Sequence, residues 1–279
     1  MHTFETPHPV SLKVELWQGQ VTVHAADTTT STVELEAVGD DSAAQDLIDH
    51  ATVEQRGDEI VVLMPKIKSG LFRRNAHVMA TITVPTHSSA KIETASADVD
   101  THGELGDTRI NTGSGDLELD TVASADLKTG SGDVELRTAR GNCSVKGGSS
   151  DISLDEVGGH ADILAGSGDV VVGQIWGTLK IKTGSGDIIV KHAGDGVDAM
   201  AGSGDLLVRR IDHGKLKAKT GSGDITVGVA DGTAAYLDIT TVTGEVTSSL
   251  DASDAPGDGD QTVELIIQAG TGDVVLQRA

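Results

Sequence analysis

The chain contains very few aromatic residues. Of its 279 residues, only two are Trp, one is Tyr and two are Phe. Large globular cores normally rely on aromatic side chains for much of their buried apolar surface area. Here Val, Ile, Leu and Ala must supply that area, which favours many thin repeated layers over one globular core. A hydrophobic fraction of 37% nevertheless argues against a disordered chain.

Cysteine and positive charge are also scarce. The single cysteine, Cys143, excludes an internal disulfide framework and a multi-cysteine metal site. The 21 Lys and Arg residues face 43 Asp and Glu residues, and a net charge of −22 argues against a nucleic-acid partner. No run of 18 apolar residues could span a membrane, and residues 1–20 lack the basic and apolar regions of a signal peptide. We therefore expect a cytoplasmic protein.

Glycine is abundant, with 35 residues, and much of it belongs to a repeat. The tetrapeptide Gly-Ser-Gly-Asp or a close variant recurs every 17 to 19 residues through the centre of the chain. More degenerate copies end at Asp98, Glu245 and Asp273. A period this constant predicts a solenoid. The regular copies end at Asp116, Asp133, Asp151, Asp169, Asp187, Asp205 and Asp224.

Each repeat contains two stretches in which aliphatic residues alternate with polar ones. After Asp169, for example, Val170 and Val172 form the first pair, and Leu179 and Ile181 form the second. Alternation with a period of two is typical of strands with one buried face. Glycine-rich breaks between the stretches provide turns. The sequence therefore predicts an all-β protein, a parallel β-solenoid of about 18 residues per coil that winds right-handed by the crossover rule.

The regions outside the regular repeat are expected to cover the two ends of the solenoid. Residues 1–93 lack the repeat and predict an antiparallel, strand-rich cap with one short helix near residues 41–50. Residues 94–245 carry the coils, and residues 246–279 are expected to form a C-terminal capping coil. Such caps are needed because an open solenoid end exposes an unpaired strand edge.

The recurring Thr-Gly-Ser-Gly-Asp-Ile-x-Val coils follow a strand-rich leader, and Thr-Ala-Ser-Ala-Asp-Val at residues 94–99 opens the array. In these features the chain resembles the bacterial "putative adhesin" β-strand-repeat family of unknown function, also called the toastrack domain. The resemblance implies a β-solenoid platform associated with envelope-stress or membrane-associated signalling. It implies no established enzymatic activity and supplies no catalytic residues.

The repeated aspartates would form a row of carboxylates one coil apart. Like charges at that spacing repel by about 1 kcal/mol in water, so something must offset them. We favour a structural role, in which each Asp accepts hydrogen bonds from turn N–H groups and a nearby serine. The alternative is a row of bound divalent cations. Calcium-binding solenoids, however, use Gly-Gly-x-Gly-x-Asp every nine residues, which matches this repeat poorly.

A second candidate site is a set of apolar residues at a position where a polar residue is expected. Val171, Ile189 and Leu207 lie between the inward-facing residues of three successive coils. Strands that are apolar on both faces are usually covered on both faces. We expect these residues to dock a protein partner, most simply a second copy of the chain. The alternative is a tolerant surface that reflects β-propensity alone.

One basic cluster stands out in the acidic chain. Lys66, Lys68, Arg73 and Arg74 surround Leu71 and Phe72, a combination that fits an anionic membrane surface or an acidic partner. The alternative is a solvated hairpin loop.

An enzymatic role is the least favoured interpretation. Catalysis needs carboxylates with separated pKa values, whereas a regular row supplies equivalent ones. The histidines fall at unrelated phases of the repeat, and Cys143 occupies an inward position. We therefore expect a non-catalytic scaffold or protein-binding platform without a cofactor. A surface adhesin is the first alternative, and a polysaccharide-acting β-solenoid enzyme is the second.

Overall fold

The computed structural model describes residues 1–39, 42–65, 76–250 and 261–279. Within these residues the chain is nearly all β, and its single helix, α1 (Ser42–Asp49), lies where the sequence predicts one. No helix of the described part is long and apolar enough to cross a membrane. The chain divides into two compact units, Met1–Ala139 and Arg140–Ala279, which are described separately.

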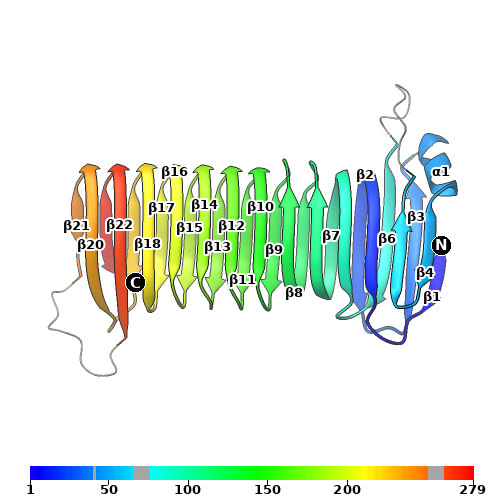
Figure 1. The fold of residues 1–279 in the computed structure, drawn as a ribbon, viewed down its shortest axis with the longest axis horizontal. Coiled ribbons are helices and arrows are strands. Elements are labelled where there is room, and N and C mark those ends of the chain that lie inside the picture. Colours follow the sequence, from blue (N-terminus) through cyan, green and yellow to red (C-terminus); the bar gives the residue numbers. More distant parts are fainter. Residues whose placement is uncertain (40–41, 66–75, 251–260) are drawn as a thin grey trace. The chain divides into compact units, whose positions relative to one another are not determined.

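The C-terminal unit is built from two-strand coils stacked in register (Figure 1). On each face, a strand pairs in parallel with the equivalent strand of the next coil; Ile188, for example, lies between Val170 and Leu206. One face is formed by β10 (Cys143–Ser149), β12 (Ala161–Ser167), β14 (Leu179–Ser185), β16 (Val197–Ser203) and β18 (Gly214–Ser222). The other is formed by β11 (Ile152–Val157), β13 (Val170–Ile175), β15 (Ile188–Ala193), β17 (Leu206–Ile211) and β19 (Ile225–Val229). The predicted parallel solenoid is confirmed.

The core of this unit lies between the two faces and is aliphatic. The inward residues Val170, Val172, Ile188 and Val190 are all fully buried, as the period of two predicts. Burying an aliphatic side chain of this size contributes about 1.5–3 kcal/mol, and every coil repeats the contribution. The solenoid is therefore stabilised by many equivalent thin layers, which is how the chain folds with so few aromatic residues.

The last four strands do not stack in chain order. They are β20 (Ala234–Thr243), β21 (Val246–Ser248), β22 (Thr262–Thr271) and β23 (Val274–Arg278). Leu265 of β22 pairs with Leu216 of β18 on one side and with Leu237 of β20 on the other. On the opposite face, β23 likewise lies between β19 and β21. Residues 262–278 therefore form the penultimate coil, and the expectation that residues 246–279 close the end is corrected.

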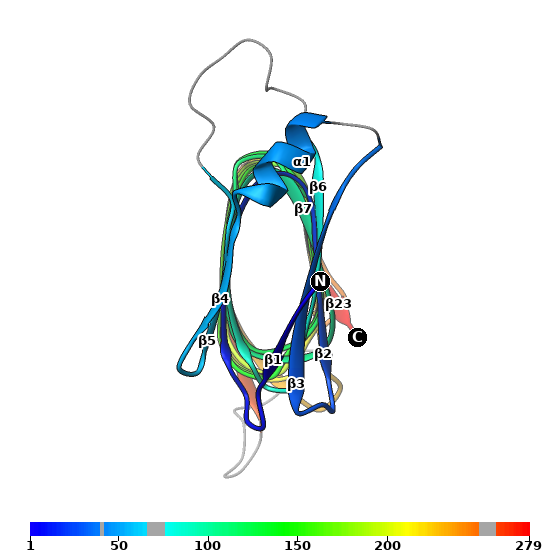
Figure 2. The ribbon, with the colours of Figure 1, turned by 90° about the vertical axis from the view of Figure 1, so that its right-hand side faces the viewer.

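The N-terminal unit is also mainly a parallel winding, seen end-on as an elongated oval in Figure 2. The long strands β2 (Ser11–Ala26) and β7 (Ser89–Thr112) pair in parallel over most of their length. β8 (Leu117–Thr129) and β9 (Val134–Ala139) continue the stack from β7. β7 runs without interruption through residue 93, where the sequence places a domain boundary. The domain boundaries themselves remain predictions.

In the described residues of this unit, antiparallel pairing occurs on the other side of β2. β5 (Glu59–Leu63) and β6 (Val78–Pro85) each pair in parallel with one half of β2. Three antiparallel pairs then cover them, β1 (His2–Glu5) with β3 (Thr30–Ala37), β3 with β6, and β4 (Thr52–Arg56) with β5. Among the described residues of 1–93, antiparallel pairing is thus restricted to these pairs, because β2 already belongs to the parallel winding.

Candidate functional site

The repeated aspartates form a hydrogen-bonded series, which we call the aspartate ladder. Within the ladder, the backbone N–H of an Asp donates to Oδ1 of the Asp in the preceding coil; Asp187, for example, donates to Asp169 over 2.8 Å. In the N-terminal unit the series joins Asp98, Asp116 and Asp133 at 2.9–3.0 Å. In the C-terminal unit it joins, at 2.8–2.9 Å, Asp151, Asp169, Asp187, Asp205, Asp224, Asp273 and finally the backbone N–H of Glu245.

A glycine precedes every aspartate of the ladder except Asp98 and Asp151, and it allows this close stacking. Gly186 has a φ of +127°, a region that L-residues with a side chain rarely adopt. A Cβ at this position would lie 2.1 Å from the carbonyl oxygen of Gly168 in the preceding coil. The corner thus needs glycine both for its backbone conformation and for the approach of the neighbouring coil.

These contacts favour the structural interpretation of the aspartate ladder. One oxygen of each joined carboxylate accepts a backbone N–H, and such charge-assisted bonds offset the repulsion between successive aspartates. Among the described residues, no three His, Cys, Asp or Glu side chains are grouped so that they could hold a metal ion. The geometry therefore supports a structural role for the aspartate ladder, in which the aspartates stabilise the bends between strands. Cation binding stays the alternative that an experiment must address.

The apolar residues singled out from the sequence lie in one line on the outer surface of the C-terminal unit. Val171 pairs with Ile189, and Ile189 pairs with Leu207, on three successive coils. All three side chains are half-buried. Ser153 precedes this apolar stripe and Thr226 follows it in the same register, so the stripe has a polar residue at each end.

Charged residues border the apolar stripe along the strands. Two residues before Ile189 lies Asp187 of the aspartate ladder, and two residues after it lies the exposed Lys191. In the next coil, Leu207 has the same neighbours in Asp205 and the exposed Arg209. The surface therefore presents an acidic row, an apolar stripe and a basic pair side by side.

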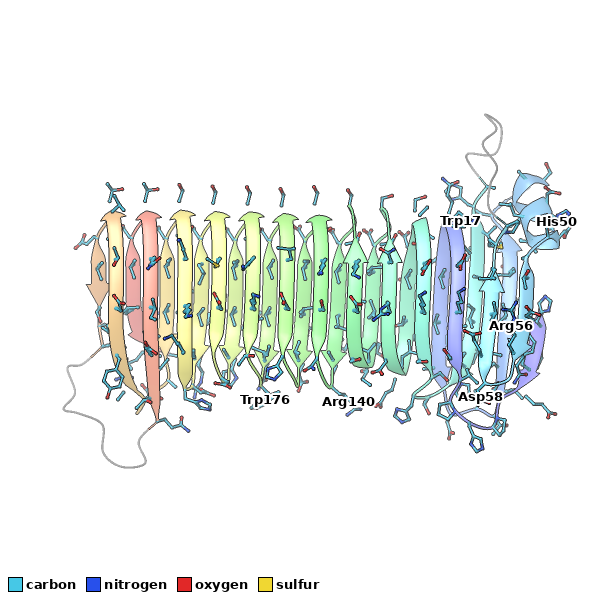
Figure 3. All side chains as sticks on the ribbon, in the orientation of Figure 1. Trp17, His50, Arg56, Asp58, Arg140 and Trp176 are labelled. Atoms are coloured by element: carbon cyan, nitrogen blue, oxygen red, sulfur yellow. The ribbon has the colours of Figure 1, made fainter. Side chains whose placement is uncertain are left out.

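A further cluster lies at the turn side of the same three coils, where β13, β15 and β17 end. His192 Nε2 and Asp212 Oδ2 are 2.8 Å apart, and Arg210 Nε donates to Asp212 Oδ1 over 2.8 Å. Trp176 packs edge-on against His192 with ring centroids 6.1 Å apart. Its side chain is 54% exposed and projects from the edge of the ribbon in Figure 3.

The electrostatics of this cluster centre on Asp212. Burial alone would raise the pKa of Asp212, but the hydrogen bonds and positive charges of His192 and Arg210 outweigh burial and hold that pKa below its usual value. The cluster joins two phases of the repeat, since Trp176 and Asp212 lie seven residues after a ladder aspartate and His192 and Arg210 lie five residues after one. The signal that could have found it is the isolated Trp176, a large residue in a turn where nothing in the repeat requires one.

The opposite face of the C-terminal unit carries alternating charges and a groove. Asp162, Lys180, Asp198 and Lys217 lie opposite one another on successive coils, and such cross-strand pairs stabilise a register. A groove of about 370 Å³ crosses this face where the alternation ends, and it is open to solvent. Its outer lining is Asp198, Met200, Lys217, Lys219, Ile266 and Gln268.

Cys143 and the basic cluster are the remaining candidates that the sequence offers. Cys143 is buried at an inward position, and burial raises the pKa of its thiol to about 12, so almost no thiolate exists at neutral pH. The basic cluster of Lys66, Lys68, Arg73 and Arg74 lies outside the described residues.

Comparison with known protein families tests the family resemblance that the repeat indicates. Residues 11–277 match the family described as Toastrack DUF4097. The chain belongs to the toastrack family. The match covers the parallel winding of both units, so the toastrack assignment applies to nearly the whole chain.

Solved structures similar to this toastrack chain are distant. A putative adhesin from Bacteroides fragilis NCTC 9343 shares 13% identity, with 99% of this chain and 96% of that chain covered and a TM-score of 0.41. A putative adhesin from Parabacteroides distasonis ATCC 8503 shares 13% identity, with 100% and 96% covered and a TM-score of 0.45. A putative lipid binding protein from the latter organism shares 12% identity, with 100% and 95% covered and a TM-score of 0.31. No curated protein matches this chain.

Proposed function

We propose that this toastrack chain is a non-catalytic binding platform and that a protein partner docks on the apolar stripe. The observation that carries the proposal is the register of Val171, Ile189 and Leu207, three apolar side chains in line on an outer face. Polar residues occupy the same line before and after them. A surface that is apolar over three coils and bordered by charge is typical of a docking site.

The borders of the stripe define the chemistry of the partner segment. A segment lying along the stripe would meet aspartates on one side and Lys191 and Arg209 on the other. We expect it to present apolar side chains in its centre, basic residues toward the aspartate ladder and acidic residues toward Lys191 and Arg209. Charge complementarity of this kind sets orientation and association rate, while the apolar contacts contribute most of the affinity.

A scaffold role agrees with the chemistry of the described residues. The carboxylates of the aspartate ladder share one environment, whereas general acid–base catalysis relies on carboxylates whose environments differ. The Asp212 cluster differs from the repeat, but its carboxylate is held ionised between two basic side chains, which suits positioning more than proton transfer. Platform function therefore remains the simplest account, and the polysaccharide-acting enzyme is the weaker alternative.

The test compares Ile189→Lys with Thr226→Lys. Both positions lie on the same line of the same face, but only Ile189 belongs to the stripe. Each variant and the wild type would be used as bait in the source lysate, and the solution mass of each would be measured. A partner retained by wild type and Thr226→Lys but lost by Ile189→Lys supports the proposal. A partner captured equally by all three baits contradicts it.

The cellular location of the platform is a separate part of the proposal. We place it in the cytoplasm, as expected from the sequence, and the family resemblance suggests a role connected with envelope-stress signalling. The alternative is a surface adhesin. Fractionation of cells distinguishes the two, because an adhesin would be recovered from the cell wall or the culture medium.

A further inference from the structure

The outermost described coil of the C-terminal unit has an open strand edge. Within the described residues, β20 pairs with β22 alone and β21 pairs with β23 alone. The other edge of each strand therefore carries backbone N–H and C=O groups that can accept a further strand. β20 is ten residues long, which is long for an edge strand that is left uncovered.

The same coil gathers exposed apolar side chains. Tyr236, Leu237, Val242 and Val246 are 55%, 47%, 79% and 44% exposed. Among the described residues of this unit, only Leu164 and Trp176 are other large hydrophobic residues with comparable exposure. Leu237 pairs with the fully buried Leu265, so it occupies an inward position that lacks a covering layer. Clustered exposure of this kind marks an interaction surface.

The edge is not adapted to continue the same parallel stack. Val242 and Glu245 replace the first Gly and the Asp of the Gly-Ser-Gly-Asp corner. The corner that would receive a further Gly-Asp turn is therefore altered at the two positions on which regular stacking depends. An antiparallel neighbour does not need that corner, because its own turn lies at the other end of the strand.

The edge also lacks the usual protection against pairing. Natural edge strands carry several charges, proline or a bulge, whereas β20 has one charged residue, Asp238, and no proline. In the N-terminal unit, the short antiparallel strand β4 instead carries Glu54 and Arg56, which form an ion pair with Arg56 Nε 2.8 Å from Glu54 Oε1. The protected edge and the unprotected edge thus differ within one chain.

The residue order of β20 fits an antiparallel copy of itself. Inward residues must face inward residues, so the two-fold axis has to pass through a residue and not between two residues. An axis at Asp238 places two Asp238 carboxylates opposite each other, which is unfavourable. An axis at Thr240 leaves Tyr236 opposite Gly244. An axis at Ile239 pairs Tyr236 with Val242, and Asp238 with Thr240, so that an aromatic residue meets a β-branched one.

We propose that this toastrack chain forms a two-fold symmetric dimer in which β20 pairs antiparallel with β20 of a second copy, centred on Ile239. The pairing continues the sheet of one copy into that of the other. It covers Leu237, places Tyr236 of each copy beside Val242 of the other, and brings no two like charges of β20 into direct opposition.

Substitutions at Thr240 test both the dimer and its register. In the proposed pairing, Thr240 of each copy faces Asp238 of the other. Thr240→Asp therefore creates two like-charge pairs, and Thr240→Lys creates two opposite-charge pairs. Thr240 is exposed, and its neighbour within the chain is Gln268, so both variants are expected to fold. Sedimentation velocity over a range of concentrations gives the dimer dissociation constant of each protein, and thermal melting checks folding.

We expect a dimeric wild type, an at least tenfold weaker dimer for Thr240→Asp and a dimer at least as tight as wild type for Thr240→Lys. A wild type that stays monomeric at about 100 μM would overturn the proposal. Equal weakening by both substitutions would overturn the Ile239-centred register. Loss of the dimer in Ile189→Lys but not in Thr240→Asp would move the interface to the apolar stripe, so failure here is distinguishable from failure of the proposed function.

Discussion

The backbone N–H of Asp187 donates a hydrogen bond to Oδ1 of Asp169, the equivalent residue one coil earlier, over 2.8 Å. Oδ1 of Asp187 in turn accepts the N–H of Asp205, also at 2.8 Å. Each aspartate in this part of the ladder is therefore both held by one neighbour and holding the other. The repeat conserves a side chain whose main partner is the backbone of the next coil.

Two substitutions of Asp187 distinguish the stabilising effect of its hydrogen-bond acceptor from the effect of its negative charge. Asp187→Ala removes the acceptor for the Asp205 N–H and should lower the free energy of unfolding by about 1–2 kcal/mol. Asp187→Asn keeps an oxygen acceptor and relieves repulsion along the ladder, so its stability should stay within about 0.5 kcal/mol of wild type. Urea unfolding followed by circular dichroism measures both. Equal losses for the two variants would show that the charge, and not the acceptor, is what matters.

Substitution of the corner glycine Gly186 should destabilise the protein more than substitution of Asp187. Gly186→Ala places a Cβ 2.1 Å from the Gly168 carbonyl oxygen at a φ of +127°, so we expect a loss of about 3 kcal/mol or more. Gly57→Ala is the matched control, because Gly57 also has a positive φ of +61° but a Cβ there meets nothing within 4 Å. It should cost about 1 kcal/mol. Thermal melting of the two variants separates steric contact from backbone conformation.

Calcium should leave the thermal midpoint unchanged. The ladder carboxylates already accept backbone N–H groups, and a ligand that stabilises the fold must bind it more tightly than the unfolded chain. We expect the midpoint in about 5 mM calcium to lie within about 1 °C of the midpoint in EDTA. An increase of several degrees that Asp187→Asn reduces would establish the cation-binding alternative.

The Asp212 cluster predicts a defined pH dependence. The pKa of Asp212 is lowered in the folded state, so its interactions stabilise the protein above the unfolded-state pKa of about 3.9. That contribution is lost as the pH falls through the lower folded-state pKa. Wild type should therefore melt above Asp212→Asn at pH 7 and pH 5, and the difference should shrink below about pH 4.

Asp155→Asn, at an exposed carboxyl of the same unit, is the control for this measurement. It should melt close to wild type across the same pH range. A constant difference between wild type and Asp212→Asn down to about pH 2 would contradict the assigned role of the carboxylate charge.

The local structure of each coil was predictable because every coil repeats the same sequence pattern. Val170 and Val172 are buried and Asp169 follows a bend, as the repeat indicates. Alternation of apolar and polar residues is a local signal, and here the local signals agree across many copies. The position of the apolar stripe on one line followed from the same constant period.

The order of the last coils was not predictable from spacing. Spacing reports how far apart two markers lie along the chain, whereas stacking depends on which coil covers which. Leu265 contacts strands on both sides and is fully buried, while Leu237, earlier in the chain, is left at the open edge. The Asp212 cluster was missed for a related reason, since His192 meets Trp176 and Asp212 of the neighbouring coils, which share a different phase of the repeat.

The position of β22 between β18 and β20 also has a consequence for synthesis on the ribosome. Residues 234–248 emerge before residues 262–278, but the surface on which they stack is provided by those later residues. Earlier coils can be added one at a time as the chain grows, whereas β20 and β21 must wait for β22 and β23. The nascent protein therefore completes its last coil out of order, and a translational pause after residue 248 would leave a strand without its template.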